Sequence, residues 1–213
     1  MNNKVAELRQ EYSTRELSED QVNSDPLKQF DIWFKEAVEC KLPEPNIMSL
    51  ATVTHEGKPS CRIVLLKGYD ERGFVFFTNY TSKKSIDLQE HPYAALTFLW
   101  LDMERQVRIE GGVEKIAESE SDTYFNSRPA GSRIGAWASP QSQPISKTEL
   151  LDNERDFEQK FAGIEIPRPP FWGGYLVKPE MIEFWQGRPN RLHDRIVYTK
   201  SSNTSWKIER IAP

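Results

Sequence analysis

Features that mark several common protein classes are scarce in this sequence of 213 residues. It has two cysteines, Cys40 and Cys61, and neither lies in a CxxC pair or in a His/Cys spacing typical of zinc sites. We therefore expect no metal site, and we interpret both cysteines as free thiols in a reducing compartment. The longest apolar run, Ala94 to Leu101, is far shorter than the roughly 20 residues that a membrane-spanning helix needs.

Charge and the lack of familiar motifs exclude further classes. The net charge of −4 disfavours a general nucleic-acid-binding surface, which needs a basic excess. The first twenty residues have neither the apolar region nor the cleavage site of a secretory signal. The sequence holds no GxSxG, no HExxH and no Gly-rich phosphate loop, so hydrolysis is not indicated. We expect a soluble cytoplasmic protein with no nucleic-acid or membrane partner.

The hydrophobic pattern predicts mainly β structure with a few helices. Residues 1–24 are polar and read as a mobile N-terminal arm, and residues 25–213 read as one folded domain. Period-2 runs predict strands, and the connections between them are mostly too short for a parallel sheet. We therefore expect an antiparallel barrel with peripheral helices. Helices are predicted over 25–40, 81–92, 118–129 and 146–161, and strands over 46–54, 59–69, 73–79, 93–101, 105–116, 173–179, 181–187, 192–200 and 205–213.

Basic residues gather at several points of this pattern. On the strand RIVLLKG, alternation places Arg62 and Lys67 on opposite faces, either as charged ends of a core strand or as grips for two separate anions. Lys83 and Lys84 open a helix, where free backbone N–H groups favour an anion, although a solvated helix end would look the same.

A third group combines Tyr124, Arg128 and Ser132. Tyr124 and Arg128 lie one helical turn apart, and a phenol, a guanidinium and a hydroxyl together suit a phosphate. The same spacing is also common on ordinary protein surfaces. Gln141 and Ser142 follow in a loop and are uninformative by themselves.

The densest group lies in EFWQGRPNRLHDR, which spans residues 183–195. Three arginines and His193 fall within eight residues there, a density tolerated most easily when anions or carboxylates lie among them. His193 is either a structural histidine or a functional one, and Asp194 either forms a salt bridge to a nearby arginine or serves the site. Several phosphate-binding groups without a phosphate loop point to a phosphorylated cofactor or substrate.

The segment IEFWQGRPNRLHDR resembles the signature of the pyridoxamine/pyridoxine 5′-phosphate oxidases. Other motifs resemble the same family in the same order, and the resemblance extends from about Leu8 to Pro213. These motifs are RIVLLK, FFTN, RQVRIEG, YFNSRP, IGAW, QS, FWGGY and ERIAP. Together they identify the chain as similar to this family over nearly its whole length.

The resemblance implies an antiparallel split β-barrel that binds FMN at a homodimer interface. It also implies oxidation of pyridoxine or pyridoxamine 5′-phosphate to pyridoxal 5′-phosphate, a step of vitamin B6 salvage. In the family, C4′ of the substrate gives a hydride to flavin N5. Dioxygen reoxidises the flavin and yields hydrogen peroxide, and the amine substrate also releases ammonia.

Residue roles also follow from the resemblance. Arg191 and His193 match the pair over the reacting carbon and are the implied catalytic residues. The residues implied to bind FMN are Arg62, Ile63, Val64, Leu65, Leu66, Lys67, Phe77, Thr78, Lys83, Lys84, Gln106, Gln141, Ser142, Trp185 and Arg195. Those implied to bind the substrate are Arg9, Gln10, Glu11 and Tyr12 of a lid segment, with Lys67, Tyr124, Arg128, Ser132, Arg191, Leu192 and His193.

One departure and two alternatives accompany this interpretation. The family usually has Arg-Lys where this chain has Lys83-Lys84, and a lysine lacks the fork with which arginine grips a phosphate. The alternatives are another split-barrel flavoprotein, such as a flavin reductase or a heme-associated protein, and a non-catalytic pyridoxal-phosphate carrier. The sequence leaves the preferred substrate open, and also whether His193 acts as a base or only orients the substrate.

Overall fold

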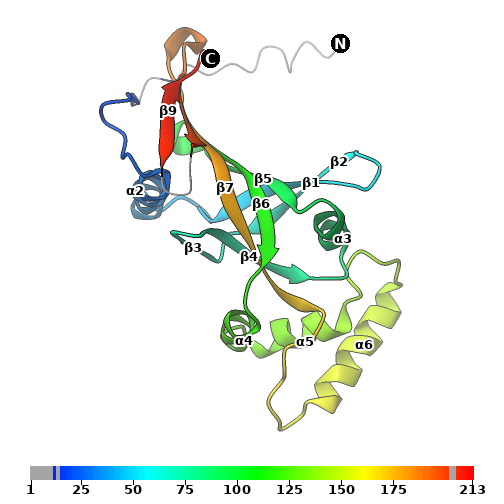
Figure 1. Ribbon diagram of the computed structural model, residues 1–213. Helices are drawn as coiled ribbons and strands as arrows, with labels where there is room; N and C mark the ends of the chain where they lie inside the picture. The colour runs from blue at the N-terminus through cyan, green and yellow to red at the C-terminus, as the bar shows by residue number, and fades with distance from the viewer. Residues whose placement is uncertain (1–11, 13–14, 202–204) are drawn as a thin grey trace, which may run out of the picture. The chain divides into compact units, whose positions relative to one another are not determined.

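A computed structural model describes residue 12, residues 15–201 and residues 205–213 (Figure 1). The predicted lid residues Arg9 to Glu11 lie outside the described residues. The chain divides into two compact units, which are described separately. Unit 1 comprises Met1–Ser49, Ala95–Glu110 and Pro179–Pro213, and unit 2 comprises Leu50–Ala94 and Gly111–Lys178.

The described part of the chain is mainly β structure with peripheral helices, as predicted. The α-helices are α2 (Pro26–Glu39), α3 (Lys83–Glu90), α4 (Glu118–Asn126), α5 (Ala130–Ala138) and α6 (Lys147–Lys160), with short 3-10 turns η1 (Leu101–Met103) and η2 (Pro189–Arg191). The strands are β1 (Ile47–Val53), β2 (Pro59–Leu65), β3 (Gly68–Asp70), β4 (Gly73–Asn79), β5 (Tyr93–Trp100), β6 (Arg105–Lys115), β7 (Trp172–Gln186), β8 (Asp194–Lys200) and β9 (Trp206–Arg210). Their order in the sheet is β2-β1-β5-β6-β7-β4-β3, with β8 between β7 and β9. None of the helices described has both the length and the apolar character needed to cross a membrane.

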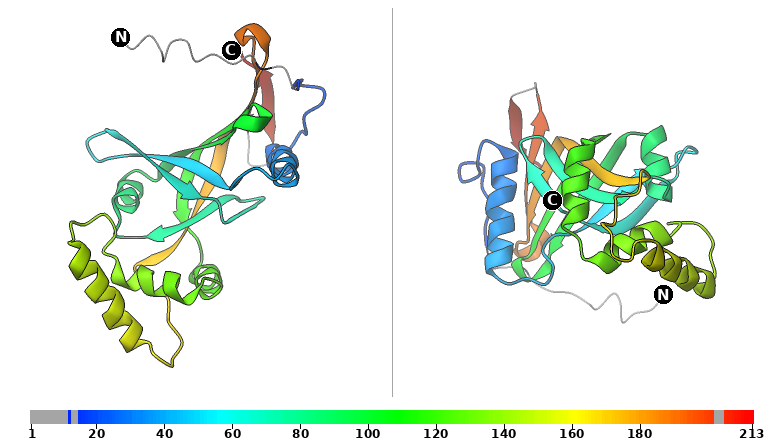
Figure 2. Two further views of the ribbon diagram at one scale, coloured as in Figure 1. Left: turned by 180° about the vertical axis from the view of Figure 1, so that it is seen from behind. Right: turned by 90° about the horizontal axis from the view of Figure 1, so that it is seen from below.

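In unit 1, helix α2 begins at a capped end and lies beside the strands of the sheet (Figure 2). The Asp25 side chain accepts a hydrogen bond from the Leu27 N–H at 2.9 Å, which satisfies a backbone donor that the helix itself leaves open. Phe30 packs on Phe98 with ring centroids 5.1 Å apart, and Trp33 packs edge-on to Phe184 of β7 at 5.1 Å. These buried rings fix the helix against the strands that carry the C-terminal motif.

The C-terminal motif forms a hairpin in unit 1. The stretch Met181 to Gln186 of β7 pairs antiparallel with β8, which in turn pairs with β9. The connecting loop, residues 187–193, therefore leaves and re-enters the sheet at neighbouring positions. The buried Tyr198 of β8 donates its hydroxyl to the Asn23 carbonyl at 2.7 Å, so the chain before α2 is joined to this hairpin.

In unit 2, β4 pairs antiparallel with β3 and with the first half of β7. Helices α4 to α6 follow, and α5 lies beside α6 (Figure 1). Their apolar faces meet in a cluster of Phe125, Ile134, Phe161, Ile166 and Trp172. This cluster gives a rigid wall to the cavity described below.

Three predicted element boundaries were wrong. The predicted strands 173–179 and 181–187 form one strand, β7, because Pro179 falls between the stretch that pairs with β4 and the stretch that pairs with β8. The predicted strand 59–69 is divided into β2 and β3. Helix α5 was not predicted, because Gly131 and Gly135 lower its helix propensity while Pro129 at its N-cap ends α4 and starts a new helix.

Candidate functional site

A cavity of about 530 Å³ in unit 2 gathers eleven of the residues predicted for the site. The predicted residues that line it are Ile63, Val64, Leu65, Lys67, Phe77, Thr78, Lys84, Tyr124, Arg128, Ser132 and Gln141. Asn79, Pro129 and Trp172 line it too and were missed. Trp172 stands in the motif FWGGY, but this motif does not indicate that the Trp172 ring faces a cavity rather than the core.

Lys84 is a buried ammonium without a carboxylate partner among the described residues. Its Nζ donates to the Thr78 hydroxyl at 3.1 Å and to the Ser82 hydroxyl at 3.2 Å. Burial, together with the nearby charge of Arg62, lowers the pKa of Lys84 to about 8. An anion at this point would supply the missing counter-charge.

Arg62 and Lys67 have different surroundings: Arg62 lies on β2, whereas Lys67 lies between β2 and β3. Lys67 lines the cavity, whereas Arg62 is not among the lining residues. The Arg62 guanidinium donates to the Thr52 hydroxyl at 2.7 Å and lies 3.7 Å from the buried carboxylate of Asp87. Desolvation lowers the pKa of Arg62, and interactions with Asp87 and Cys61 offset this only in part.

Arg128 reaches the cavity over a stack of aromatic rings. Phe77 and Tyr124 stack with centroids 3.9 Å apart, and Phe77 stacks on Trp172 at 5.5 Å. The Arg128 guanidinium lies 4.7 Å from the Trp172 ring centroid, in cation–π geometry. Its Nη1 is buried without a hydrogen-bond partner among the described residues, and burial lowers its pKa. This orphaned donor is the second sign that the cavity takes an anion.

Two glycines after Trp172 make the aromatic wall possible. A Cβ at Gly173 would stand 2.2 Å from the Tyr80 hydroxyl oxygen, and one at Gly174 would stand 2.4 Å from a methyl carbon of Ile116 and 2.9 Å from the Phe77 ring. Neither distance is tolerable for a side chain. The pair of glycines therefore lets β7 carry Trp172 close against its neighbours.

Lys83, Gln141 and Ser142 lie around the same helix start. Thr78 donates its hydroxyl to Gln141 Oε1 at 3.2 Å, which ties the loop to β4. Lys83 and Ser142 line a second hollow of about 520 Å³ rather than the first. Lys83 is half exposed and lies 3.3 Å from Asp87, so, unlike Lys84, it has a carboxylate partner.

The other predicted residues lie in unit 1, around the β7–β8 loop. The rings of Trp185 and His193 lie 4.6 Å apart, and Tyr12 packs edge-on to both, at 5.8 Å and 5.9 Å. Gly187 allows this approach, because a Cβ there would stand 2.7 Å from Tyr12. Tyr12 is the only predicted lid residue in the described part of the chain, and it already contacts the predicted catalytic histidine.

His193 has a defined hydrogen-bond pattern. Its Nδ1 accepts a hydrogen bond from the Arg188 backbone N–H at 3.0 Å. A backbone N–H can only donate, so Nδ1 carries no proton and the neutral ring is protonated at Nε2. Burial and the charge of Arg191 lower the pKa of His193, partly offset by Asp194. At neutral pH the ring therefore offers a donor, not a base, to a ligand at Nε2.

Arg195 is engaged within the protein. Its Nε and Nη2 donate to the two oxygens of the buried Glu183 at 2.8 and 3.0 Å, and Nη1 donates to the Ala212 carbonyl at 3.0 Å. Arg108 donates to the same carboxylate at 3.1 Å. Asp194 forms ion pairs with arginines, so the salt-bridge interpretation of that residue is confirmed.

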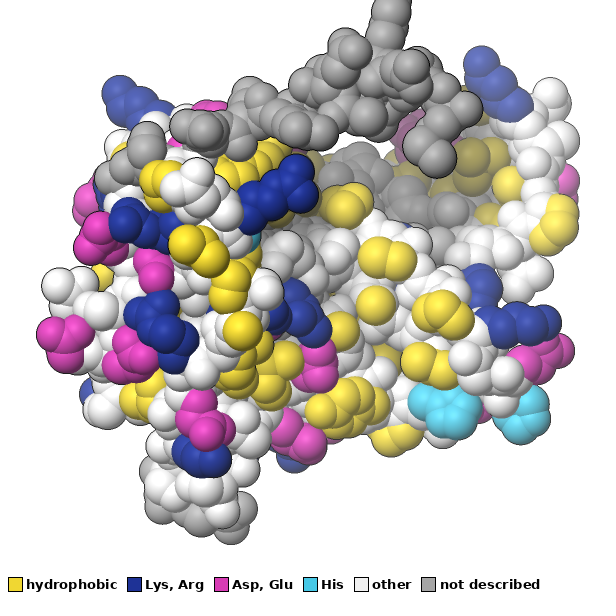
Figure 3. All heavy atoms as spheres, turned by 90° about the horizontal axis from the view of Figure 1, so that it is seen from above, with side chains coloured by type: hydrophobic (Ala, Val, Ile, Leu, Met, Phe, Trp, Pro, Cys, Tyr) yellow, Lys and Arg dark blue, Asp and Glu magenta, His cyan; other side chains and the backbone are white. Residues whose placement is uncertain are grey.

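The remaining predicted residues are less constrained. Arg191 and Leu192 are exposed, and Arg191 makes no ion pair with any described residue. Gln106 lies half-buried on β6. On the face in Figure 3, basic side chains of the described residues lie beside acidic ones, so charge on that face is mixed. The structure thus assembles two groups of predicted residues, the cavity group in unit 2 and the loop group in unit 1.

Comparison with known proteins gives the site its context. The family profile described as pyridoxamine 5′-phosphate oxidase matches residues 34–154, and the pyridoxine 5′-phosphate oxidase C-terminal dimerisation region matches residues 172–213. A protein of Burkholderia lata named pyridoxine/pyridoxamine 5′-phosphate oxidase is 58% identical over 211 residues, 98% of this chain and 99% of that protein. One of the same name from Bordetella pertussis is 56% identical over 209 residues, again 98% and 99%.

A solved structure extends the likeness to the fold. PhzG from Burkholderia lata 383, crystallised with tetrahydrophenazine-1-carboxylic acid, matches with a TM-score of 0.87 and 29% identity, over 94% of this chain and 100% of that one. Fold and motifs define a flavoprotein oxidoreductase of the split-barrel class, as the sequence predicted. More narrowly, the chain belongs to the pyridoxamine 5′-phosphate oxidase family, and its C-terminal dimerisation region supports a homodimer.

Proposed function

We propose that this protein oxidises pyridoxine or pyridoxamine 5′-phosphate to pyridoxal 5′-phosphate with FMN as cofactor and dioxygen as electron acceptor, in the cytoplasm. The names of the relatives that are 56–58% identical support this activity. The observation that carries it is chemical. One cavity holds the buried ammonium of Lys84 and the half-buried guanidinium of Arg128, whose Nη1 is buried, and neither has a carboxylate partner among the described residues.

Two unneutralised cations fit two phosphate esters, one from the cofactor and one from the substrate. Lys84, with Arg62 close enough to depress its pKa, suits the FMN phosphate. Arg128, with Tyr124 and Ser132 on the same cavity wall, suits the substrate phosphate. Lys67 lines the cavity with them and adds charge on the substrate side. Each site would be satisfied only by its ligand, because the residues that the structure describes supply no competing carboxylate there.

When bound, FMN supplies the redox chemistry, taking a hydride from the substrate and passing two electrons to dioxygen to give hydrogen peroxide. The protein's contribution is to hold both rings by their phosphates in a fixed register. The loop group adds the substrate-side contacts: Arg191 provides a permanent positive charge and His193 a hydrogen-bond donor. In a homodimer, we assign the loop group of one subunit to the cavity group of its partner, with FMN at the interface.

Anaerobic reduction tests the proposal directly. The yellow holoenzyme is mixed with pyridoxamine 5′-phosphate without oxygen, and flavin absorbance near 450 nm is followed before air is admitted. The expected result is bleaching, then recovery in air with one peroxide and one pyridoxal 5′-phosphate formed for each flavin. Flavin that stays oxidised would refute the proposal, and purified protein without flavin would favour the carrier alternative.

The fold likeness to PhzG favours a second candidate, oxidation of a tricyclic carboxylic acid. A carboxylate would meet Arg128 as well as a phosphate does, but it would leave less negative charge for the cavity. The same anaerobic test, run with tetrahydrophenazine-1-carboxylic acid, separates the two candidates. We expect the phosphate ester to bleach the flavin faster, and the reverse order would favour the second candidate.

A further inference from the structure

The predicted catalytic loop is held by residues far away in the chain, and it reaches them through a side chain that has no role in the site as described so far. This side chain belongs to Arg188, which begins the turn after Gly187. Its significance rests on the proposed function, because that function makes His193 a substrate contact. The question is what keeps the loop in place.

The loop does not hold its own shape without support. Asn190 and Arg191 both have left-handed backbone conformations, with φ of 56° and 60°. Such conformations cost free energy in residues other than glycine, and a long side chain such as arginine is unusual there. Two successive residues of this kind persist only where surrounding contacts fix them.

Arg188 supplies contacts in two directions. Its backbone N–H donates to His193 Nδ1 at 3.0 Å, which closes the loop and selects the ring tautomer. Its guanidinium donates to the Arg15 carbonyl at 2.9 Å and pairs with the Glu16 carboxylate. One residue therefore joins the histidine to the segment Arg15–Glu19, which we call the strap.

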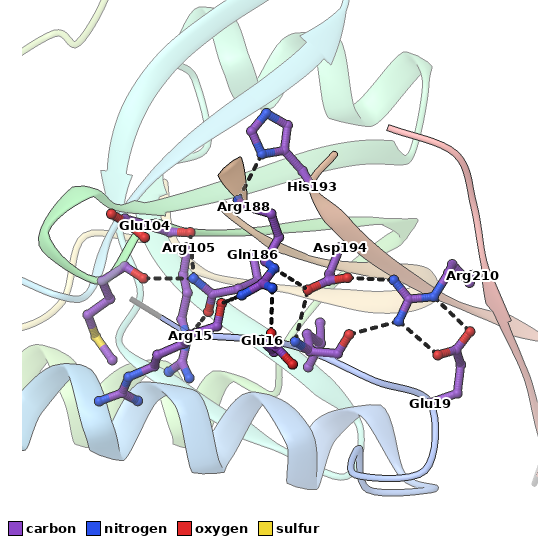
Figure 4. A network of polar contacts seen from close by, with 12 residues as sticks. Arg15, Glu16, Glu19, Glu104, Arg105, Gln186, Arg188, His193, Asp194 and Arg210 are labelled. Atoms are coloured by element: carbon purple, nitrogen blue, oxygen red, sulfur yellow. Dashed lines mark hydrogen bonds and ion pairs between the residues drawn. The ribbon is translucent and has the colours of Figure 1, made fainter. Parts of the chain in front are cut away.

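Asp194 and Arg210 fasten the strap on its other side (Figure 4). Asp194 lies between two arginines, 3.5 Å from Arg188 Nε and 2.6 Å from Arg210 Nη1, and it accepts the Leu17 N–H at 3.1 Å. Arg210 also donates to the Leu17 carbonyl and to the Glu19 carboxylate, each at 2.8 Å. The Leu17 side chain is buried, so the strap is anchored by packing as well as by charge.

We propose that Arg188 is a positioning residue that couples the strap to the substrate-side contacts, so that docking of Arg15–Glu19 sets the orientation of His193 and Arg191. In this arrangement the guanidinium of Arg188 acts at a distance from the substrate. Its removal loosens the loop without removing a substrate contact. Tyr12, which precedes the strap in the sequence, also packs on His193.

The test compares Arg188→Gln with Arg72→Gln in the full-length holoenzyme. Arg72 is a matched control, because it also pairs with two carboxylates, those of Asp70 and Glu120, and lies outside the site. In Arg188→Gln we expect the KM for pyridoxamine 5′-phosphate to rise at least fivefold, with a smaller change in kcat and unchanged FMN affinity. Arg188→Lys keeps the charge and should recover part of the loss.

A double-mutant cycle isolates the link to the strap. Glu16→Gln alone should raise KM to a lesser extent, and it should add little in the Arg188→Gln background because both changes break the same connection. Additive effects of the two changes would overturn the coupling.

A second readout does not depend on turnover. In ¹⁵N-labelled holoenzyme, the three histidines give separate imidazole signals, and the spectrum of His193→Asn assigns the signal of His193. We expect the Nε2–H tautomer in the wild type and in Arg72→Gln, and a mixture of tautomers in Arg188→Gln. If Arg188→Gln matches the control in this spectrum, the proposal is wrong. A wild type that binds FMN but oxidises neither substrate would instead refute the proposed function, and the spectrum would still decide the role of Arg188.

Discussion

The cations of the cavity and the cations of the C-terminal hairpin are neutralised in different ways. In the cavity, Lys84 is held by hydroxyls alone and Arg128 leaves a buried nitrogen without a partner among the described residues. In the hairpin, Arg195 pairs with Glu183, and Arg210 pairs with Glu19 and Asp194. Both regions are rich in positive charge, but Arg188, Arg195 and Arg210 of the hairpin already have carboxylate partners.

This difference distinguishes the cations that stabilise the fold from the cations that are free to bind a ligand. A buried cation that already has its carboxylate holds the fold together, and breaking such a pair is costly because a charge is left behind. A buried cation without one is costly until a ligand arrives, so the fold keeps it for that ligand. Arg191 is the exception in the hairpin, since it is exposed and makes no ion pair with any described residue. The comparison therefore predicts different outcomes for arginines four positions apart.

The largest effect is expected from Arg191→Ala compared with Arg195→Ala. Arg191→Ala should lower kcat/KM about 100-fold or more, the loss of a strong charge-assisted contact, with the free energy of unfolding unchanged. Arg195→Ala should instead cost about 3 kcal/mol of stability, because Glu183 keeps only Arg108. Steady-state kinetics measure kcat/KM, and urea unfolding measures the free energy of unfolding. An Arg191→Ala protein that loses flavin affinity as much as activity would contradict the assignment.

Arg128→Ala tests the unpaired cation of the cavity. We expect kcat/KM for pyridoxine 5′-phosphate to fall about 100-fold, since bonds to charged groups contribute roughly 1.5–3 kcal/mol each. Oxidation of unphosphorylated pyridoxine, already slow, should change little. Arg155→Ala on the exposed face of α6 is the control, because that arginine has a carboxylate neighbour, Asp152. Equal losses of kcat/KM for both substrates would show that Arg128 does not bind the substrate phosphate.

Lys84 predicts a pH dependence of cofactor binding. Burial lowers its pKa to about 8, so the ligand-free protein holds the ammonium below that pH and loses the proton above it. A bound phosphate favours the ammonium. FMN affinity should therefore be full below pH 8 and should weaken as the pH rises further, approaching tenfold for each pH unit.

Fluorescence titration of FMN between pH 7 and pH 9.5 measures this effect, with riboflavin as a ligand that lacks the phosphate. Lys84→Gln should bind FMN more weakly and show no such slope. The same slope in Lys84→Gln would assign the titration to another group.

The smallest effect is expected from Lys67→Ala. Lys67 lines the cavity but its side chain is largely exposed, so water screens its charge. The KM for the phosphorylated substrate should rise about three- to tenfold, a fraction of the loss expected at Arg128, and the protein should stay yellow. Flavin absorbance of the purified variant checks the second point. A colourless variant would show that Lys67 binds FMN rather than the substrate.

Much of the fold could be predicted because it depends on local patterns. The helices predicted over 25–40 and 146–161 are confirmed as α2 and α6, and the side chains of Asp25 and Ser146 cap them by accepting a backbone N–H. Where the prediction was wrong, the pairing of strands that are distant in sequence overrode the local preference of a single residue. Pro179 is tolerated in the middle of β7 because the strand changes partner there, and a sequence does not reveal partners.

The sequence motifs predicted the candidate site. They could not show which of its arginines pair with carboxylates of the protein and which are left for a ligand. Arg188, Arg195 and Arg128 look alike in the sequence. Their difference comes from the carboxylates that the fold brings beside them: Glu16 is 172 positions from Arg188 in sequence, and Glu183 is 12 positions from Arg195. Trp172 was missed for a similar reason, because whether an aromatic ring faces the core or a cavity depends on packing with residues of other elements.

The left-handed backbone at Asn190 and Arg191 has a consequence for engineering this enzyme. Selection for heat resistance alone would favour glycine at both positions, because glycine adopts this conformation without steric cost. A variant selected in that way would have a higher melting temperature but a lower turnover number, because the loop would be easier to fold and also easier to deform. Asn190 and Arg191 therefore lower the stability of the protein but keep this short turn in a single conformation.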